Sequence, residues 1–273
     1  MRQSADQFLR HYLVAMQYFT RIPVTGALAQ WTGFSPDLLR ASAIHFPGVG
    51  WLPGMAACVV FAVVSIGLPE TPLSPLAAAV ACTIATALLT GGFHEDGLAD
   101  LADGLGGSAE RERALAIMKD SRLGSFGALA LGLALAAKVT LLAVLASQTA
   151  AGVLAALLAA HVVSRFWPLC LIHTLPHVGD AAASKSKPLA DSIERRSLLL
   201  AALWAVLPLA LMVLASGWAF ALVALAASGL ALLALRRLLA RRLQGYTGDA
   251  LGAAQQVCEV AFYLGAAFGL SAR

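Results

Sequence analysis

Four acidic residues lie within nine positions of one segment, GGFHEDGLADLADGLGG at 91–107. An α-helix turns by about 100° per residue, so Asp96, Asp100 and Asp103 share one face, at about 0°, 40° and −20°. Carboxylates this close repel one another unless a cation lies among them. Mg²⁺ and Mn²⁺ prefer carboxylate oxygens and often keep waters and substrate phosphates as further ligands. The spacing therefore predicts a divalent metal site; a solvated acidic face at the end of a helix is the alternative.

Cations and glycines follow in the stretch IMKDSRLGSFG at 117–127. Lys119 and Arg122 flank Asp120 and Ser121, and an apolar run begins directly after them. The N-terminus of a helix offers free N–H donors and the positive end of the helix dipole, and both attract phosphate. Anion donors beside a metal site suit a pyrophosphate, with Arg122 as the stronger candidate. Anchoring of both cations at a membrane surface is the alternative.

Ionisable side chains also occur inside apolar runs, where they are costly and usually functional. His161 and Arg165 are four residues apart on one helical face, so Arg165 could reach a cavity shared with the acidic segment. Glu259 lies about three turns into the last apolar run and needs a partner such as Arg165, Lys138 or a metal-bound ligand, and of these we expect Arg165. Asp249, at the start of that run, acts either at phosphates or as a helix N-cap. Lys138 is expected to extend towards the far membrane surface.

The loop at 173–197 is long enough to act as a lid over such a site. It contains His173, His177, Lys185, Ser186 and Lys187. The two lysines are predicted to contact the substrate, and anchoring at the membrane surface would explain them equally well.

The elements that must position these residues are membrane helices. Of the 273 residues, 59% are hydrophobic and only 12% are charged, and the mean hydropathy is +0.78. Soluble domains carry about 25% charged residues. We therefore expect one integral membrane domain over 1–273. The net charge of +4 does not indicate nucleic acid as a partner, because the basic residues are spread over loops between apolar runs. The four cysteines lack ligand spacing, so neither disulfides nor structural zinc is expected.

Seven apolar runs have the length of roughly 20 residues that a helix needs to cross the bilayer. Ahead of them, residues 1–24 show apolar positions at helical spacing, which predicts an amphipathic helix at the membrane surface. The expected fold class is all-α, a polytopic bundle of about seven transmembrane helices plus this N-terminal helix. The runs are 49–68, 73–92, 124–146, 149–172, 198–215, 217–235 and 252–270.

The basic residues predict an orientation. Sixteen of the 19 Lys and Arg residues lie before the first run or in the loops after the second, fourth and sixth runs. The loops after runs one, three and five contain none. Because loops rich in Lys and Arg stay on the cytoplasmic side, the N-terminus is predicted to be cytoplasmic and the C-terminus outside. The acidic segment then lies at the cytoplasmic end of the bundle.

Several stretches in this order resemble one family, adenosylcobinamide-GDP ribazoletransferase, also called cobalamin 5′-phosphate synthase. The family pattern His-x-Asp-Gly-Leu-Ala-Asp-x-x-Asp-Gly falls on His94 to Gly104, and Glu95 occupies its variable position. The resemblance covers essentially the whole chain. The matching stretches are TRIPV at 20–24, HFPGVGWLPG at 45–54, GGFHEDGLADLADG at 91–104, IMKDSRLGSFGALAL at 117–131, SR at 164–165 and TGDALGA at 247–253, with Glu259 beyond.

The resemblance implies an enzyme of the bacterial inner membrane that completes cobalamin assembly on the cytoplasmic side. It would join α-ribazole, or its 5′-phosphate, to adenosylcobinamide-GDP and release GMP, with Mg²⁺ as cofactor. The expected partners are the two substrates, the lipid bilayer, other enzymes of the cobalamin pathway and a second copy of the chain.

Carried over residue by residue, the resemblance also implies roles. Asp96, Asp100 and Asp103 would bind the metal, and Asp120 or Asp249 would be a further ligand or the base that takes the ribazole hydroxyl proton. Arg122 and Lys119 would hold the pyrophosphate. The predicted substrate contacts are His94, Ser121 and Arg165, which lie in matching stretches, together with Lys185 and Lys187 of the loop at 173–197, which no matching stretch covers.

Two other functions remain open from the residues. A phosphotransferase that acts on a nucleotide-activated lipid alcohol, similar to the CDP-alcohol phosphotransferases, would also use clustered aspartates, although at a different spacing. A cation transporter would use acids near membrane helices, but transport acids usually lie near the midplane. Here all of the acids except Glu259 are predicted at the cytoplasmic rim.

Overall fold

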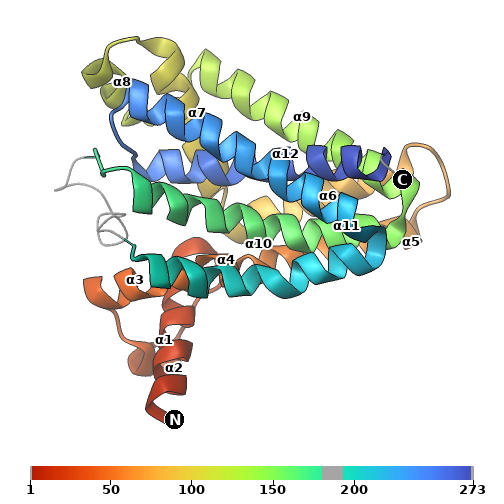
Figure 1. The fold of residues 1–273 in the computed structure, drawn as a ribbon, viewed down its shortest axis with the longest axis horizontal. Coiled ribbons are helices and arrows are strands. Elements are labelled where there is room, and N and C mark those ends of the chain that lie inside the picture. Colours follow the sequence, from red (N-terminus) through yellow and green to blue (C-terminus); the bar gives the residue numbers. More distant parts are fainter. Residues whose placement is uncertain (1, 180–192, 272–273) are drawn as a thin grey trace.

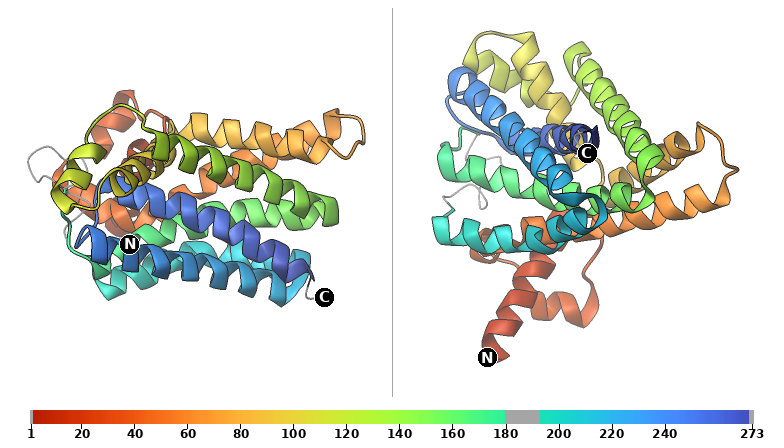
Figure 2. Two further views of the ribbon diagram at one scale, coloured as in Figure 1. Left: turned by 90° about the horizontal axis from the view of Figure 1, so that it is seen from above. Right: turned by 45° about the vertical axis from the view of Figure 1, so that its right-hand side comes forward.

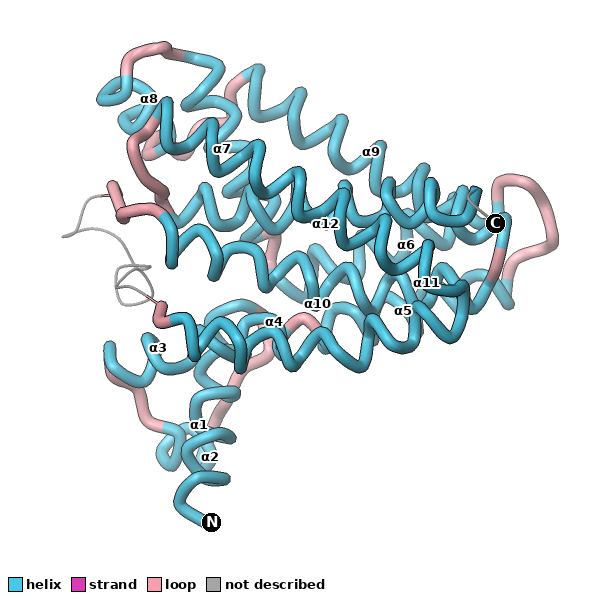
Figure 3. The backbone as a smooth tube through the Cα atoms, viewed as in Figure 1, coloured by secondary structure: helices cyan, strands magenta, loops and turns pink. Residues whose placement is uncertain are grey.

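The computed structural model describes residues 2–179 and 193–271, which fold into helices. Within these ranges there is no β-strand, only an isolated bridge between His177 and Tyr246. The long helices lie alongside one another as a bundle, and shorter helices gather towards one end of it (Figures 1 and 3). The all-α class predicted from the composition is confirmed.

The chain enters through helices that stand to one side of the bundle (Figure 2). The first of them buries Val14 and Phe19 against the bundle and leaves Phe8 50% exposed, as expected of an amphipathic helix. These elements are α1 (Arg2–Phe19), α2 (Gly26–Thr32), α3 (Pro36–Ser42), a 3₁₀ turn (Ala43–His45) and α4 (Phe46–Val49).

Six long helices form the bundle itself. The most deeply buried is α10, whose Ala160 and Val162 are fully covered, so this helix lies in the middle of the bundle. Its apolar side chains face protein on nearly all sides, as expected of a central helix. The six are α5 (Trp51–Gly67), α6 (Ser74–Thr90), α9 (Ser125–Gln148), α10 (Ala150–Thr174), α11 (Arg195–Arg242) and α12 (Gly248–Ser271).

Helix α11 is in fact two helices that meet at Gly217. This glycine has φ 79° and ψ 173°, a conformation that residues with a Cβ rarely adopt. The chain reverses there, so that both halves run along the bundle (Figure 1). The predicted runs 198–215 and 217–235 therefore lie in the two arms of one hairpin.

Four described helical stretches are long and apolar enough to cross a membrane: Pro36–Gly67, Ser125–Gln148, Ala150–Thr174 and Arg195–Arg242. The count rises to five if the bent pair of α6 and α7 (Phe93–Gly107) is one span. Each of the seven predicted runs coincides with a helix or an arm of α11. The membrane character is thus confirmed, whereas seven crossings and a cytoplasmic N-terminus stay predictions.

Arginine side chains bind helix ends together at the end of the bundle that carries α7 and α8 (Arg111–Met118). Arg242, at the end of α11, donates to the carbonyls of Leu105 and Ser108 at 3.0 and 2.6 Å. Arg111 in turn donates to the carbonyl of Leu243 at 2.7 Å. Because the last carbonyls of a helix lack partners within the helix, these arginines cap the ends of α7 and α11.

Candidate active site

Two consecutive glycines turn the chain from α6 into α7. Gly91 and Gly92 have φ values of 71° and 70°, in the left-handed region that glycine adopts without a steric penalty. As a result α7 is bent by 90° from α6 and lies across one end of the bundle (Figure 1). The acidic face predicted on this helix is thereby placed at that end.

Helix α7 crosses the start of α12 through a contact between backbones. A Cβ atom on Gly97 would lie 2.7 Å from the carbonyl oxygen of Asp249, and one on Gly252 would lie 3.3 Å from the Cα of His94. Only glycine fits the first position without a shift of the backbone. Because Asp96 precedes Gly97, this crossing makes the carboxylates of the two helices neighbours.

Three aspartates from the two helices form an acidic face. Asp96 is exposed, and Asp100 and Asp249 are partly buried. Burial, and then the charges of Asp96, Asp249 and Asp103, raise the pKa of Asp100 to about 7. Burial and the charge of Asp96 raise the pKa of Asp249 to about 6. The carboxylates therefore repel one another, and a bound cation would relieve that repulsion.

The face is open rather than a closed cage of ligands. Among the described residues, no three His, Cys, Asp or Glu side chains are grouped closely enough to hold a metal ion by themselves. Mg²⁺ usually takes only one or two carboxylates and completes its shell with waters and substrate phosphates. Asp96 and Asp100 provide two such carboxylates, with Asp249 close to them, and this arrangement fits that mode of binding.

Asp103 makes a structural contact that the spacing did not reveal. Its Oδ2 accepts from the amide of Gly124 at 2.7 Å and its Oδ1 from the amide of Gly127 at 2.8 Å. The carboxylate thus caps the N-terminus of α9, and those two amides are not free for the phosphate that we expected there. The role of Asp103 as a metal ligand stays a prediction. To bind a metal, each carboxylate oxygen would use the lone pair that does not accept an amide hydrogen bond.

The cap of α12 is Thr247 and not Asp249. The Thr247 hydroxyl accepts from the amide of Ala250 at 3.2 Å. The Asp249 carboxylate is 3.5 Å from that hydroxyl and makes no capping bond. The helix-cap interpretation of Asp249 is therefore wrong, which leaves its carboxylate available for chemistry.

Arg122 and Asp120 form an exposed ion pair in the loop after α8. The Arg122 Nη2 lies 2.6 Å from Asp120 Oδ2, and its Nε lies 3.0 Å from Oδ1. These bonds lower the pKa of Asp120 to about 2. Lys119 and Ser121 are exposed in the same loop. Asp120 is therefore a poor proton acceptor, and Arg122 must exchange this partner to bind a phosphate.

A cavity of about 720 Å³ opens beside the acidic face. Its walls come from the end of α1 and the segment after it, the turn between α6 and α7, the first half of α7, and the region around the start of α9. It is lined by Gln17, Tyr18, Thr20, Arg21, Thr90, Gly91, Gly92, Phe93, Glu95, Asp96, Ala99, Leu123 and Leu131.

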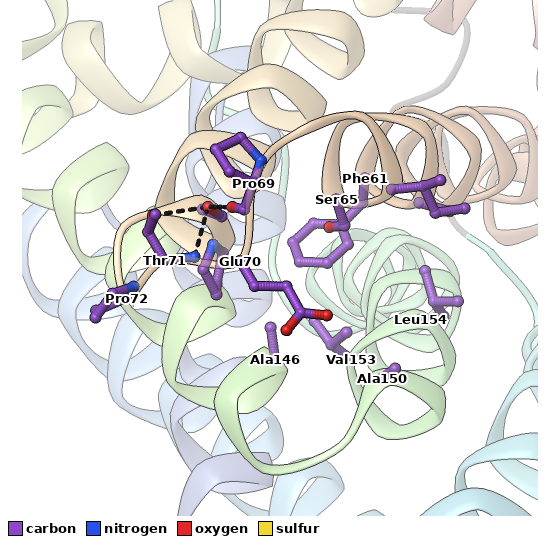
Figure 4. A pocket seen from close by; sticks show the side chains of 14 residues that line it. Phe61, Ser65, Pro69, Glu70, Thr71, Pro72, Ala146, Ala150, Val153 and Leu154 are labelled. Atoms are coloured by element: carbon purple, nitrogen blue, oxygen red, sulfur yellow. Dashed lines mark hydrogen bonds between the residues drawn. The ribbon is translucent and has the colours of Figure 1, made fainter.

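A second cavity, of about 660 Å³, lies at the opposite end of the bundle, between the loop after α5 and the start of α10 (Figure 4). Most of its lining is apolar, as with Phe61, Val153 and Leu154, and among the described residues that line it only Glu70 is charged. Without a cation in its lining, this cavity is not suited to phosphates.

A sequence profile described as cobalamin-5-phosphate synthase matches residues 11–267, nearly the whole chain. The chain belongs to the cobalamin-5-phosphate synthase family. Proteins named adenosylcobinamide-GDP ribazoletransferase are 59% identical to it in Polaromonas sp., 59% in Polaromonas naphthalenivorans and 56% in Albidiferax ferrireducens. These alignments cover 97% of this chain and 99%, 99% and 100% of the three relatives. No solved structure matches the chain.

The family motif of cobalamin-5-phosphate synthase places its histidine in the interior. His94 is 1% exposed, and its ring stacks on Phe46 with the centroids 5.9 Å apart. Arg165 is 2% exposed and donates to the carbonyl of His161 at 2.9 Å. Neither side chain lines the cavity beside Asp96. Their substrate contacts stay predictions, as do those of Lys185 and Lys187, which lie outside the described residues.

The partner of Glu259 differs from the one expected. Its Oε1 lies 2.7 Å from the Nζ of Lys138, which is buried instead of reaching towards a membrane surface. Two expectations are therefore wrong, the pairing of Glu259 with Arg165 and the extension of Lys138 to the membrane surface. The physical reason is that α9 and α12 pack together, so that two costly charges neutralise each other.

Amide side chains connect this buried pair to Glu95 on α7. Gln256 donates to Glu95 Oε1 at 3.0 Å and to the side-chain oxygen of Gln255 at 3.0 Å. Gln255 donates to Glu259 Oε2 at 2.6 Å and to Ser164 at 3.0 Å. The sequence prediction set Glu95 aside and assigned no role to the two glutamines. The signal was present, because adjacent amides in an apolar helix indicate polar partners on a neighbouring helix.

Proposed function

We propose that the acidic face of Asp96, Asp100 and Asp249, together with Mg²⁺, carries out the reaction for which relatives of this chain are named. In that reaction a hydroxyl of α-ribazole, or of its 5′-phosphate, attacks the phosphate attached to adenosylcobinamide. The bond to GMP breaks, and GMP leaves while the cobalamin skeleton is completed. The observation that carries the proposal is that carboxylates from α7 and α12 converge beside a cavity of about 720 Å³.

The side chains have distinct roles in this proposal. Phosphoryl transfer requires mainly positioning and charge stabilisation, and bound Mg²⁺ would supply positive charge to the pyrophosphate. Of the two expected bases, Asp249 is the better proton acceptor, because its pKa of about 6 is near neutrality whereas Arg122 holds that of Asp120 at about 2. Arg122 and Lys119 contact the phosphates from the loop after α8.

The location forms part of the same proposal. The bundle lies in the bacterial inner membrane. Its end with α7 and α8 faces the cytoplasm, because the Lys- and Arg-rich loops gather there. Both substrates then reach the acidic face from the cytoplasm. Other enzymes of the cobalamin pathway and a second copy of the chain are the further partners that we expect.

The test is release of GMP by the purified protein in detergent. With adenosylcobinamide-GDP, α-ribazole and Mg²⁺ we expect GMP, and a chelator should abolish it. Asp96→Asn should lower turnover by about 100-fold or more, because oriented charge stabilisation of the phosphates is lost. The matched control is Glu112→Gln, on the exposed side of α8, which should retain activity. GMP release that needs a lipid alcohol, or that survives chelation, would overturn the proposal.

A further inference from the structure

The segment TRIPV follows α1 and is tied to the end of α6. The Thr20 hydroxyl donates to the carbonyl of Met16 at 2.7 Å and accepts from the amide of Ile22 at 3.1 Å, which fixes the turn after the helix. The amide of Arg21 donates to the carbonyl of Leu89 at 2.7 Å. The backbone of Arg21 is thereby held next to the glycine turn that leads into α7.

The Arg21 guanidinium rests against Gly91 in that turn. A Cβ on Gly91 would contact the Arg21 Nε, and it would lie 2.9 Å from both Cζ and Nη2. The lack of a side chain at Gly91 thus provides the space for the guanidinium. Within residues 2–179 and 193–271, Arg21 has no carboxylate within salt-bridge distance, unlike Arg122 with Asp120.

Arg21 lines the cavity of about 720 Å³ together with Glu95 and Asp96. The cavity therefore has an unpaired cation and two acids in its lining. Tyr18 and Phe93 also line it, with their ring centroids 6.1 Å apart at 74°. Aliphatic side chains, among them Leu123, complete the walls. A volume of this size suits a nucleotide, since ligand pockets measure about 300–1,000 Å³.

These features match one substrate class, an apolar aromatic nucleoside monophosphate. The guanidinium suits a phosphate, because an arginine binds phosphate oxygens through two parallel N–H bonds. Aromatic and aliphatic walls suit a benzimidazole base, which has no exocyclic donors or acceptors, whereas guanine has both. With the phosphate bound to Arg21, the ribose hydroxyls would face Asp96, which lines the same cavity.

We propose that this cavity is the acceptor site and that Arg21 binds the 5′-phosphate of the ribazole nucleotide. The proposal rests on the proposed function, whose acidic face it borders. It assigns a specificity-determining residue, because the unphosphorylated nucleoside would leave the guanidinium without a ligand. It also gives the TRIPV segment a role that helix packing alone does not require.

The experiment compares two acceptors with the full-length protein in detergent. KM and kcat are measured for α-ribazole and for α-ribazole 5′-phosphate, at saturating adenosylcobinamide-GDP and Mg²⁺, in the native protein and in Arg21→Gln, Arg21→Lys and Arg113→Gln. Arg21→Gln should raise KM for the phosphorylated acceptor by about 10- to 100-fold, because a hydrogen bond between charged groups is lost. KM for α-ribazole should stay unchanged. Arg21→Lys should fall in between. Arg113→Gln removes one exposed charge from α8 and should match the native protein.

Several results would overturn the inference. A higher KM for adenosylcobinamide-GDP in Arg21→Gln, measured at saturating acceptor, would assign the guanidinium to the pyrophosphate. Equal losses of kcat with both acceptors would make Arg21 a packing residue. If Arg21→Gln does not fold, Arg21→Lys decides, and an unchanged ratio of the two KM values refutes the assignment. If the native protein releases no GMP with either acceptor, it is the proposed function that fails, and not the Arg21 assignment alone.

Discussion

Lys138 and Glu259 form an ion pair in the interior of the bundle, with 2.7 Å between Nζ and Oε1. Lys138 belongs to α9 and Glu259 to α12, and their side chains are only 3% and 1% exposed. The hydroxyl of Tyr263 donates to the same carboxylate oxygen at 3.2 Å, and His161 Nδ1 lies 3.7 Å from the other. Because an unpaired charge in this environment is costly, the pair ties α9 to α12 beneath the acidic face.

The first prediction concerns this pair. Glu259→Gln should destabilise the protein by about 3–5 kcal/mol, because it leaves the Lys138 ammonium buried without its counter-charge. Lys138→Met should be costly for the same reason. The double variant removes both charges and should cost less than the two single losses added. Thermal unfolding in detergent, followed by helical circular dichroism, measures all three.

The matched comparison is Arg165, which donates to the carbonyl of His161 at 2.9 Å instead of pairing with Glu259. The losses from Arg165→Gln and Glu259→Gln should be closer to additive than those of the Lys138 cycle. A stronger coupling of Glu259 to Arg165 than to Lys138 would contradict the pairing.

The second prediction concerns the contact of Asp103 with the start of α9. A Cβ on Gly127 would meet the Asp103 carboxylate and would lie 2.8 Å from the carbonyl of Ala99. Gly127→Ala should therefore push α9 away from α7 and lower both stability and turnover. Gly132→Ala lies in the same helix, and its Cβ would meet nothing within 4 Å, so it should be neutral. Equal unfolding temperatures for the two variants would refute the close contact.

Local periodicity predicted the helices and the shared face of α7, because both depend on residues within a few turns of one another. The angles of Asp96, Asp100 and Asp103 follow from 100° per residue alone. The partner of each carboxylate does not. Asp103 is satisfied by amides 21 and 24 residues further along the chain, and only the packing of α7 against α9 brings those amides within reach.

For the buried charges, too, the sequence predicted contacts within a helix but not contacts between helices. His161 and Arg165 were expected on one face because they are four residues apart, and they do contact each other, with 3.2 Å between Nδ1 and Nη1. Glu259 pairs with Lys138, which lies on a different helix. Helical periodicity cannot predict a pair between helices that are far apart in the sequence. The 90° bend between α6 and α7 could not be predicted from the sequence either. Two adjacent glycines permit many turns, and tertiary packing selects one of them.

The third prediction is topological and follows from the gathering of Lys and Arg in alternate loops. A cysteine that replaces Gly107, near the end of α7, should react with an impermeant thiol reagent only from the cytoplasmic side. A cysteine that replaces Gly67, where a Cβ would meet nothing within 4 Å, should react only from outside. Labelling of both positions from one side would remove the assigned orientation, and so would reversed labelling. The position 184, in the loop predicted as a lid, lies outside the described residues and provides a third probe for the cytoplasmic side.

The last prediction concerns pH and the acidic face. The pKa of Asp100 is raised from 3.8 to about 7 and that of Asp249 from 3.8 to about 6, first by burial and then by neighbouring carboxylates. The folded protein therefore binds more protons than the unfolded chain between about pH 4 and pH 7. In a chelator, the free energy of unfolding should fall as the pH rises through this window. Mg²⁺ should reverse the trend above pH 7, because it binds the deprotonated carboxylates and relieves their repulsion.

Protons that bind to Asp100 and Asp249 compete with Mg²⁺ for these carboxylates. The Mg²⁺ concentration for half-maximal GMP release should therefore rise as the pH falls from 8 to 6. Asp100→Asn removes the group with the higher pKa and should flatten both dependences, in addition to lowering turnover. Asp37→Asn, an exposed acid of α3 that pairs with Arg40 at 3.5 Å, serves as the control and should leave both curves unchanged. If the unfolding temperature in chelator does not depend on pH between 5 and 7.5, or if Asp100→Asn keeps the native Mg²⁺ curve, then Asp100 does not share a cation with its neighbours. The metal site would then have to be sought among the remaining acids of α7 and α12.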